Sequence, residues 1–399
     1  MTNWMQRVTS FWHRDNAIKT NESKQSRAHA LISLYAGGQP VWTPRNYQAL
    51  AKEGFVENAV GYRCVKMIAE AASSIKWHVV EDGKKFDAHP LLELLSQPNP
   101  AESGRTLLEN FYGFLQIAGN AYLEATILDN QVRELHVLRP DRMKVIAGRN
   151  GWPQAYKYSV NGSSVRFDQS GEPVTPILHV KLFNPVDDHY GMSPFEAAAK
   201  GIDIHNAAGA WNKALLDNAA RPSGALVYDS KNGDANLTQE QFERLKTELE
   251  NTFQGSTNAG RPMVLEGGLD WKPLSHSPKD MEHIEAKHVA AREIALAFGV
   301  PPMLLGIPGD NTFANYAEAN KTFWRQTVLP LVDKTAQSLS NWLKPAFGSD
   351  IALGFNAESI AALSREREAL WKMVNAASFL SDAEKRQITG LDKQVPAKN

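Results

Sequence analysis

The pattern of apolar and polar positions changes character near Gly191. Before it, short segments alternate between apolar and polar residues, as in IKWHVV (75–80) and YLEATILD (122–129). That two-residue period is typical of half-exposed β-strands. After Gly191, apolar residues recur at helical spacing over long runs. The pattern therefore predicts an α+β unit over residues 31–190, followed by a mainly helical part.

The α+β unit carries two helical patterns among its short strands, at 58–73 and 103–118. Its clearest turn signal is Asn161-Gly162, which stands between alternating segments at 156–160 and 164–167. An Asn-Gly pair favours the two-residue turns of β-hairpins. We therefore expect antiparallel strands in this unit.

Two capped helix starts follow. Ser193 precedes a proline and, at the third helical position, a glutamate, which predicts a helix to about residue 218. Ser277 opens a similar pattern, which predicts a second helix that ends before Gly299. The residues between the two helices indicate a small lobe, with a strand at 224–229, a capping box at Thr238 and Gln241, and two strands around Gly267 and Gly268.

The segment between the second capped helix and a further helical pattern at 315–342 is longer than the roughly four to six residues of most connections. It is also apolar, containing Met303, Leu304, Leu305, Ile307 and Phe313, so it is not an ordinary surface turn. Pro330 lies inside the following helix and should kink it. Beyond residue 356, apolar residues return at helical spacing: Ile360, Leu363, Leu370 and Val374.

An amphipathic pattern also opens the chain, with Trp4, Met5, Val8, Phe11 and Trp12 on one helical face. A polar run at 19–27 follows, so residues 1–30 form a predicted arm and linker. The arm either lies on a membrane surface or docks on a neighbouring chain, and both interpretations stay open. No segment reaches the ~18 consecutive apolar residues of a spanning helix, so we expect no membrane-spanning part.

The charge balance argues against tight binding to nucleic acid or to anionic membranes. The chain has 43 Lys and Arg residues and 44 Asp and Glu residues, which gives a formal net charge of -1. Any contact with DNA would therefore be local or loose. The single cysteine, Cys64, excludes internal disulfides and cysteine-rich zinc sites and favours a reducing cytoplasm.

The sequence lacks the motifs of nucleotide-driven enzymes, because it has neither a GxxxxGK[ST] loop nor a glycine-rich dinucleotide turn. His283 and His288 are five residues apart, so their rings point to different faces of a helix, unlike the spacing of four in metal-binding helices. Two acid–base groupings remain, Asp187 and Asp188 with His189, and Asp203 with His205, and neither comes with a nucleophile motif. We interpret them as a polar loop and a solvated helix face, with a hydrolase as the weaker alternative. We predict no catalytic residue, no metal and no cofactor.

Six blocks of sequence occur in the order found in one protein family. They are HPLLELLSQPNP (89–100), GNAYLE (119–124), LRPDRM (138–143), GMSPFEAA (191–198), FGVPPMLLG (298–306) and NYAEANKTFWRQTVLPLV (315–332). Together they resemble the portal proteins of tailed bacteriophages, specifically the HK97-type family, over most of the chain. Each block alone is weak, and the six in order make the match specific. Relatives of this family occur in phages, prophages and gene transfer agents.

The resemblance implies a homo-oligomeric ring, usually a dodecamer, at one vertex of a virion capsid. Double-stranded DNA is pumped through such a ring by a separate terminase and later released, so its contact with the ring would be weak and sequence-independent. The implied partners are the terminase large subunit, the head-tail adaptor and the major capsid protein, with assembly in the bacterial host cytoplasm. The alternative function is a peripheral membrane or capsid scaffold protein without a DNA channel.

The resemblance also divides the chain into parts with expected roles. Residues 31–190 would be the wing, 191–220 and 277–300 the two stem helices, 221–276 the clip between them, 301–314 the tunnel loop, 315–357 the kinked tunnel helix with its return to the wing, and 358–399 a short helical crown.

Three groups of residues are predicted to meet DNA or partners. The tunnel loop would present Ile307, Pro308, Gly309, Asp310, Asn311, Thr312 and Phe313 to the DNA. Lys213 and Lys287 would be scattered basic contacts from the stem, and solvated lysines are an interpretation of comparable weight. In the clip, Gly255, Ser256, Thr257, Asn258 and Arg261 would contact the terminase or the adaptor, against the alternative of an ordinary mobile loop. A channel with few basic residues suits transport, because every engaged lysine or arginine adds affinity for phosphate.

Overall fold

The computed structural model describes residues 42–217, 224–228, 238–240, 243, 244, 247, 269–273, 283–308, 313–348, 350–357 and 360–389. The chain divides into two compact units, Met1–Val41 and Trp42–Asn399. The first unit contains the predicted arm and lies outside the described residues. The fold below is that of the second unit.

Helices α2 (Ala59–Ser73) and α4 (Gly104–Ala118) pack against each other, close to the predicted bounds. Each begins at a side chain that accepts hydrogen bonds from backbone amides of the first turn, Asn58 for α2 and Ser103 for α4. Shorter helical segments accompany them: α1 (Tyr47–Leu50), the π-helical η1 (Ala51–Val56), α3 (Pro90–Ser96) and the 3-10 turn η2 (Pro140–Arg142).

The strands of this part are antiparallel, as the sequence predicted. One sheet has the order β11-β1-β2, formed by β1 (Trp77–Glu81), β2 (Lys84–Phe86) and β11 (Ala352–Phe355). A second has the order β4-β3-β8, formed by β3 (Asn120–Leu128), β4 (Gln131–Leu138) and β8 (Ile177–Lys181). A third has the order β5-β6-β7, formed by β5 (Met143–Ala147), β6 (Pro153–Val160) and β7 (Ser163–Asp168).

The predicted hairpin turn joins β6 to β7. Asn161 and Gly162 have φ of 49° and 82°, and Val160 pairs with Ser163 directly across the turn. Positive φ at both central positions is what a type I′ turn requires, and Asn and Gly tolerate it best. The prediction of a hairpin at this site is confirmed.

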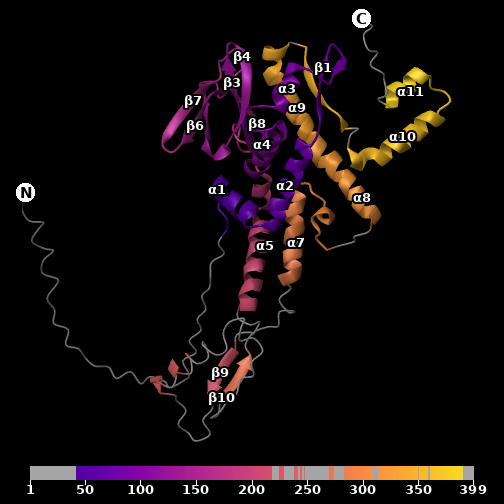
Figure 1. The fold of residues 1–399 in the computed structure, drawn as a ribbon. Helices are drawn as coiled ribbons and strands as arrows, with labels where there is room; N and C mark the ends of the chain where they lie inside the picture. Colours follow the sequence, from indigo (N-terminus) through magenta and orange to yellow (C-terminus); the bar gives the residue numbers. More distant parts are fainter. Residues whose placement is uncertain are drawn as a thin grey trace, which may run out of the picture. The chain divides into compact units, whose positions relative to one another are not determined.

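The two long helices after residue 190 are α5 (Pro194–Asp217) and α7 (His283–Ala297), which pack side by side (Figure 1). The start of α5 has the predicted capping box: Phe195 N–H donates to the Ser193 hydroxyl at 3.0 Å, and Ser193 N–H donates to the Glu196 carboxylate at 3.1 Å. Gly299, with φ of 66°, follows the end of α7 in the left-handed conformation that favours glycine.

Most of the insert between α5 and α7 lies outside the described residues. Its described strands, β9 (Gly224–Tyr228) and β10 (Leu269–Pro273), pair antiparallel with Leu226 opposite Trp271. They confirm the strand predicted at 224–229 and the one predicted after Gly268. The strand predicted before Gly267 and most of the helix after Thr238 fall on residues that are not described.

The single long helix predicted at 315–342 is divided. Helix α8 (Phe313–Thr322) passes into a π-helical segment, η6 (Phe323–Val328), and then into α9 (Leu329–Phe347). Pro330 was expected to kink a continuous helix, but it sits in the first turn of α9. The backbone stays helical across this boundary, because Leu329 N–H donates to the Trp324 carbonyl, and the irregularity takes the form of the wider π-helical turn before the proline.

The described residues from 361 to 389 are mainly helical, as the apolar spacing beyond residue 356 predicted. It comprises the 3-10 turn η8 (Ala361–Leu363), α10 (Ser364–Ala376) and α11 (Asp382–Thr389). Leu370, Trp371 and Met373 on α10 remain exposed, whereas Val374 is buried. No helix in the described parts of the chain combines the length and apolarity needed to cross a membrane.

One large core joins the helices of the α+β part and α9 to the start of α5 and the end of α7. Ile68 of α2, Phe111 of α4 and Leu339 of α9 are fully buried in it. Phe195 of α5 and Phe298 after α7 meet edge to face within the same core, with ring centroids 4.9 Å apart. Burying a side chain of this size stabilises the fold by about 1.5–3 kcal/mol. The start of α5 and the end of α7 are therefore fixed to the α+β part.

Candidate functional site

The entry into α5 is held by a backbone crossing at two glycines. Gly119, at the end of α4, has φ of 70°, and its carbonyl accepts a hydrogen bond from Leu182 N–H at 2.8 Å. The Asn120 side chain accepts from Gly191 N–H at 2.8 Å and donates to the Gly191 carbonyl at 3.2 Å. Asn120 thus pins the segment that leads into α5 to the start of β3.

His179 of β8 contacts Asn120 at the same crossing. Its Nε2 lies 2.9 Å from Asn120 Oδ1, and its ring stacks on Tyr122 with centroids 4.2 Å apart. Because that amide oxygen can only accept, Nε2 carries the proton, and Nδ1 is left to accept from the Tyr156 hydroxyl at 3.4 Å. Burial, followed by the charges of nearby Lys181 and His189, lowers the pKa of His179 to about 3. The ring is therefore neutral.

A second joint fixes the middle of α5 to the start of α2. Asn58 is buried, and its Oδ1 caps α2 by accepting from Val60 and Gly61 N–H. Its Nδ2 donates to Asn206 Oδ1 at 2.8 Å and lies 3.2 Å from His205 Nδ1. The side-chain amide of Asn58 therefore both caps α2 and holds α5. His205 Nδ1 can accept a hydrogen bond from Asn58 only while the imidazole is neutral.

The acid–base groupings singled out in the sequence have structural partners. Asp203 accepts hydrogen bonds from the backbone amide and hydroxyl of Thr43, with the amide at 3.0 Å. Asp187 Oδ1 accepts from the backbone amides of His189 and Tyr190, at 2.7 and 3.0 Å. These contacts favour the interpretation of a polar loop and a helix face over that of a hydrolase site. Among the described residues, no three His, Cys, Asp or Glu side chains gather as they would around a metal.

Helices α5 and α7 expose apolar side chains on the faces that do not pack together. On α5, Ile204 is 43% exposed, and it shares a face with Lys200 and Ala207. On α7, Val289 and Leu296 are 44% and 79% exposed and lie seven residues apart, on one face. These exposed apolar side chains leave both helices able to pack against a partner surface.

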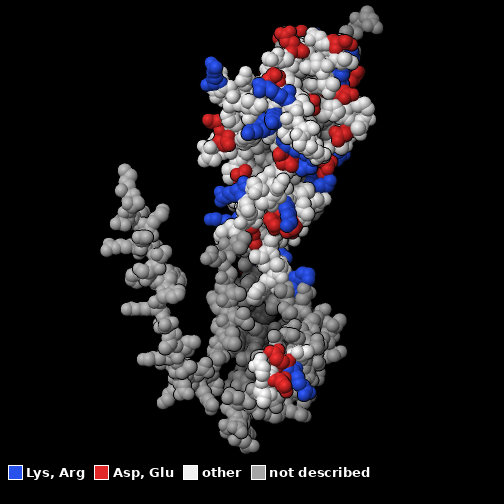
Figure 2. All heavy atoms as spheres, turned by 90° about the vertical axis from the view of Figure 1, so that its left-hand side faces the viewer, with Lys and Arg blue, Asp and Glu red and all other residues white. Residues whose placement is uncertain are grey.

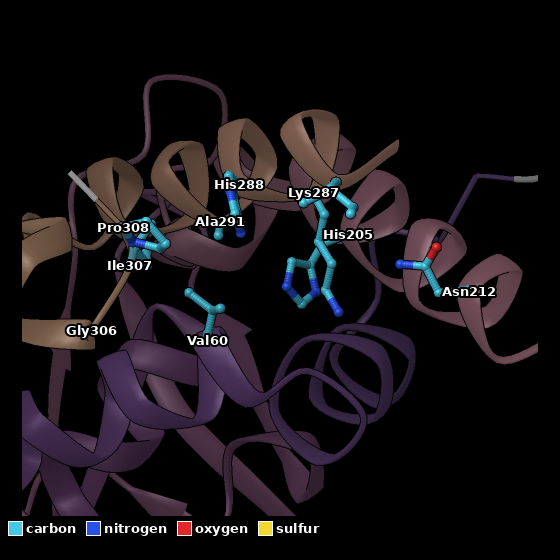
Figure 3. Close-up of a pocket in the computed structure, with 10 residues that line it drawn as sticks. Val60, His205, Asn212, Lys287, His288, Ala291, Gly306, Ile307 and Pro308 are labelled. Atoms are coloured by element: carbon cyan, nitrogen blue, oxygen red, sulfur yellow. The ribbon is translucent and has the colours of Figure 1, made fainter. Parts of the chain in front are cut away.

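A pocket of about 380 Å³ opens between α5, α7, the start of α2 and the loop after α7 (Figure 3). Its lining is both apolar and basic: Val60, His205, Asn212, Ile284, Lys287, His288, Ala291, Gly306, Ile307 and Pro308. The Lys287 and His205 side chains lie close to each other in this view (Figure 3), and burial followed by the charge of Lys287 lowers the pKa of His205. The Arg292 guanidinium holds the far wall by donating to the Pro308 carbonyl at 2.6 Å.

The structure places only part of the predicted channel and clip residues. Ile307 is buried within the subunit at 8% exposure, whereas Pro308 is exposed. Phe313 is the first residue of α8, and residues 309–312 lie outside the described residues. Lys213 is exposed on α5, and Lys287 is half-buried on α7. The clip residues 255–258 and 261 also lie outside the described residues. The assignment of these residues to DNA or to partners stays a prediction.

Sequence reasoning missed Asn58, Asn120 and His179, which hold the α+β part to α5 and to the segment that leads into it. The signal for Asn58 was available, because an asparagine before a helical pattern is a good cap. Its second role was not, since His205 and Asn206 lie 147 and 148 residues away. Asn120 and Gly191 are likewise 71 residues apart.

Charge is distributed without a dominant sign on the face shown in Figure 2. Lysine and arginine side chains alternate with aspartate and glutamate over the described part of that face. The arrangement agrees with the near-zero net charge of the chain. A strong phosphate-binding surface would instead collect basic side chains in one area.

Comparisons with known proteins agree on one family. The family model described as phage portal protein matches residues 59–390. A chain in the neck of an empty gene transfer agent particle, computed with C6 symmetry, is 52% identical, with a TM-score of 0.73 over 89% of this chain and 96% of that one. A chain in the neck of the native particle, computed with C12 symmetry, has the same identity and coverage and a TM-score of 0.70. The portal protein of enterobacteria phage HK97 is 24% identical over 86% of this chain and 78% of its own length. On these matches, this chain belongs to the phage portal protein family.

Proposed function

We propose that this protein is the portal subunit of a phage or phage-like particle. Copies of it would form a ring at one capsid vertex, through which double-stranded DNA enters during packaging and leaves during ejection. The observation that carries the proposal is the 52% identity, over 89% of the chain, to a chain in the neck of a gene transfer agent particle with C12 symmetry. That match also supports a twelve-membered ring and a place in the virion.

The parts of the subunit then take roles that fit their structures. The α+β part would be the wing, α5 and α7 the stem, and the lobe that contains β9 and β10 the clip, facing the terminase and then the head-tail adaptor. The loop after α7 would border the channel, and α10 and α11 would form a small crown. The wing would meet the major capsid protein. None of these roles requires catalysis, and we propose no enzymatic activity.

Ring formation is expected to depend on the exposed apolar faces of α5 and α7. We predict that Ile204→Glu combined with Leu296→Glu weakens assembly at least about a hundredfold, because each apolar side chain buried between subunits contributes roughly 1–2 kcal/mol and each glutamate must be desolvated. Mass photometry against protein concentration measures the effect. Both positions are exposed in the subunit, so its thermal unfolding should change little.

The matched control places a glutamate at an exposed position of the β6–β7 hairpin, Ser159→Glu, and should assemble like the wild type. Negative-stain microscopy of the wild type should show rings with a central hole. A wild-type chain that stays monomeric with the capsid protein present, or that binds liposomes through its first 30 residues, would favour the peripheral membrane scaffold instead.

The basic residues of the stem are expected to have a modest effect on DNA transport. Lys213 carries the proposed DNA contact more directly than Lys287, because Lys213 is exposed and Lys287 lines the pocket. We predict that Lys213→Ala lowers the DNA packaged per particle about twofold, with ring formation unchanged. The measurement is nuclease-protected DNA in purified particles.

A variant without residues 255–261 is assayed in parallel and should form rings but fail to package or to join tails. If both variants package normally, the assigned contacts are wrong.

A further inference from the structure

The loop at 182–190, which leads from β8 towards α5, presents two apolar side chains to solvent. Phe183 is 83% exposed and Val186 is 89% exposed, higher fractions than for any other large hydrophobic residue of the described wing. The two acidic residues that follow, Asp187 and Asp188, are exposed as well. We call residues 182–190 the docking loop.

The docking loop is held in shape by its own hydrogen bonds. Asn184 Oδ1 accepts from Val186 N–H at 3.0 Å, and Asn184 Nδ2 donates to the Tyr190 carbonyl at 2.9 Å. The Tyr190 hydroxyl accepts from Val145 N–H of β5 at 2.9 Å, and the Lys181 ammonium donates to the Asp188 carbonyl. A loop backbone held in this way lowers the ordering cost of presenting Phe183 and Val186 to a partner, which is how a preorganised contact gains affinity.

The pocket beside α5 and α7 has the complementary chemistry. Val60, Ile284, Ala291, Ile307 and Pro308 supply apolar surface to its lining. Among the described residues, the ion pairs of α7 join Glu285 to His288 and to Arg292. The half-buried ammonium of Lys287, on the same helix, takes part in no ion pair there. A half-buried cation of this kind is stabilised by an incoming carboxylate.

The loop and the pocket are built from different residues of the subunit. The docking loop follows β8 of the β4-β3-β8 sheet, whereas the pocket opens at the start of α2. Helix α4 packs against both α2 and β3 and so stands between them (Figure 1). Two different surfaces that fit each other are what a head-to-tail contact requires, and such contacts form a ring when the rotation from one copy to the next closes.

We propose that the docking loop of one copy seats in the α5–α7 pocket of the next copy, with Phe183 and Val186 against the apolar lining and Asp188 facing Lys287. This contact deepens the proposed function and rests on it, because a second copy beside each subunit comes from the ring. Lys287 would then serve the subunit interface, which leaves Lys213 as the DNA contact on the stem.

A charge exchange tests the pairing. Asp188→Lys alone places two ammonium groups at the contact, and Lys287→Asp alone places two carboxylates there, so each variant should lower the fraction of rings by about tenfold or more. A 1:1 mixture of the two variants should restore rings, because alternating subunits then meet only opposite charges. Mass photometry of each variant and of the mixture gives the result. Single variants that assemble like the wild type, or a mixture that stays dissociated, would overturn the contact and leave the proposed function standing.

A crosslink provides a second measurement on the full chain. The native cysteine, Cys64, is fully buried, so cysteines placed at Val186 and at Ile284 on the pocket wall can be read without interference. Oxidation of the Val186→Cys, Ile284→Cys variant should give a ladder of linked subunits on a denaturing gel. The control pair, Val186→Cys with Ser159→Cys, should give none. Equal ladders from both pairs, or rings that yield no ladder, contradict the contact, whereas a wild type without rings contradicts the proposed function as well.

Discussion

A Gly191→Ala variant should lose about 4 kcal/mol or more of its free energy of unfolding. A methyl group on Gly191 would lie 2.1 Å from the Gly119 carbonyl oxygen and 2.7 Å from Leu182 N, both backbone atoms that cannot rotate away. Overpacking costs about 1–3 kcal/mol by itself. Moving the Gly119 and Gly191 segments apart also breaks the hydrogen bonds between Asn120 and Gly191 and between Leu182 and Gly119, at about 0.5–1.5 kcal/mol each. A domain stable by roughly 5–15 kcal/mol would be left marginal or unfolded.

Urea unfolding of the purified variants measures this loss. The control is Gly113→Ala, within α4, where an added methyl group meets nothing within 4 Å. Because alanine is the better helix former, that variant should be unchanged or more stable by up to about 1 kcal/mol. If Gly191→Ala unfolds at the same urea concentration as the wild type, the crossing is not a fixed joint.

Acid should lower the stability of the fold through His179. Its pKa is about 3 in the folded protein and about 6.5 in the unfolded chain. Between these two pH values the imidazole is protonated in the unfolded chain but stays neutral in the folded protein. The stability contributed by the neutral ring is therefore complete above pH 6.5 and is lost as the pH falls towards 3. At 1.36 kcal/mol per pH unit, the loss approaches about 4–5 kcal/mol over that range.

The measurement compares urea unfolding at pH 7 and pH 4 for the wild type and for His179→Gln. Glutamine can still donate to Asn120 but does not titrate, so this variant should start less stable at pH 7 and depend less on pH. Some dependence will remain, because burial also lowers the pKa values of His78 and His205. Parallel pH curves for the two proteins would show that His179 does not carry the effect.

Several features of the fold could be predicted from sequence because they are decided within a few residues. Asn58, Ser103 and Ser193 start helices by accepting hydrogen bonds from amides two or three positions on. The Asn161-Gly162 pair specifies its hairpin turn in the same way. The order of the six sequence blocks was sufficient to indicate the family, which the comparisons confirmed.

Other features depended on which surfaces meet in the folded chain. The periodicity of α5 showed that one face is apolar, but it could not show that Asn206 of α5 would meet Asn58 and the Glu53 carbonyl. It could not show that Ile307, in a loop expected at a channel, packs into the subunit, or that a π-helical turn would absorb the irregularity before Pro330. The sequence by itself therefore determined the helices, the turns and the family, because these depend on local backbone hydrogen bonds and residue order. Only the tertiary structure decided the joints at Asn58 and Gly191 and the pocket at Lys287, because each is built from residues far apart in the chain whose contacts exist only once the core has packed.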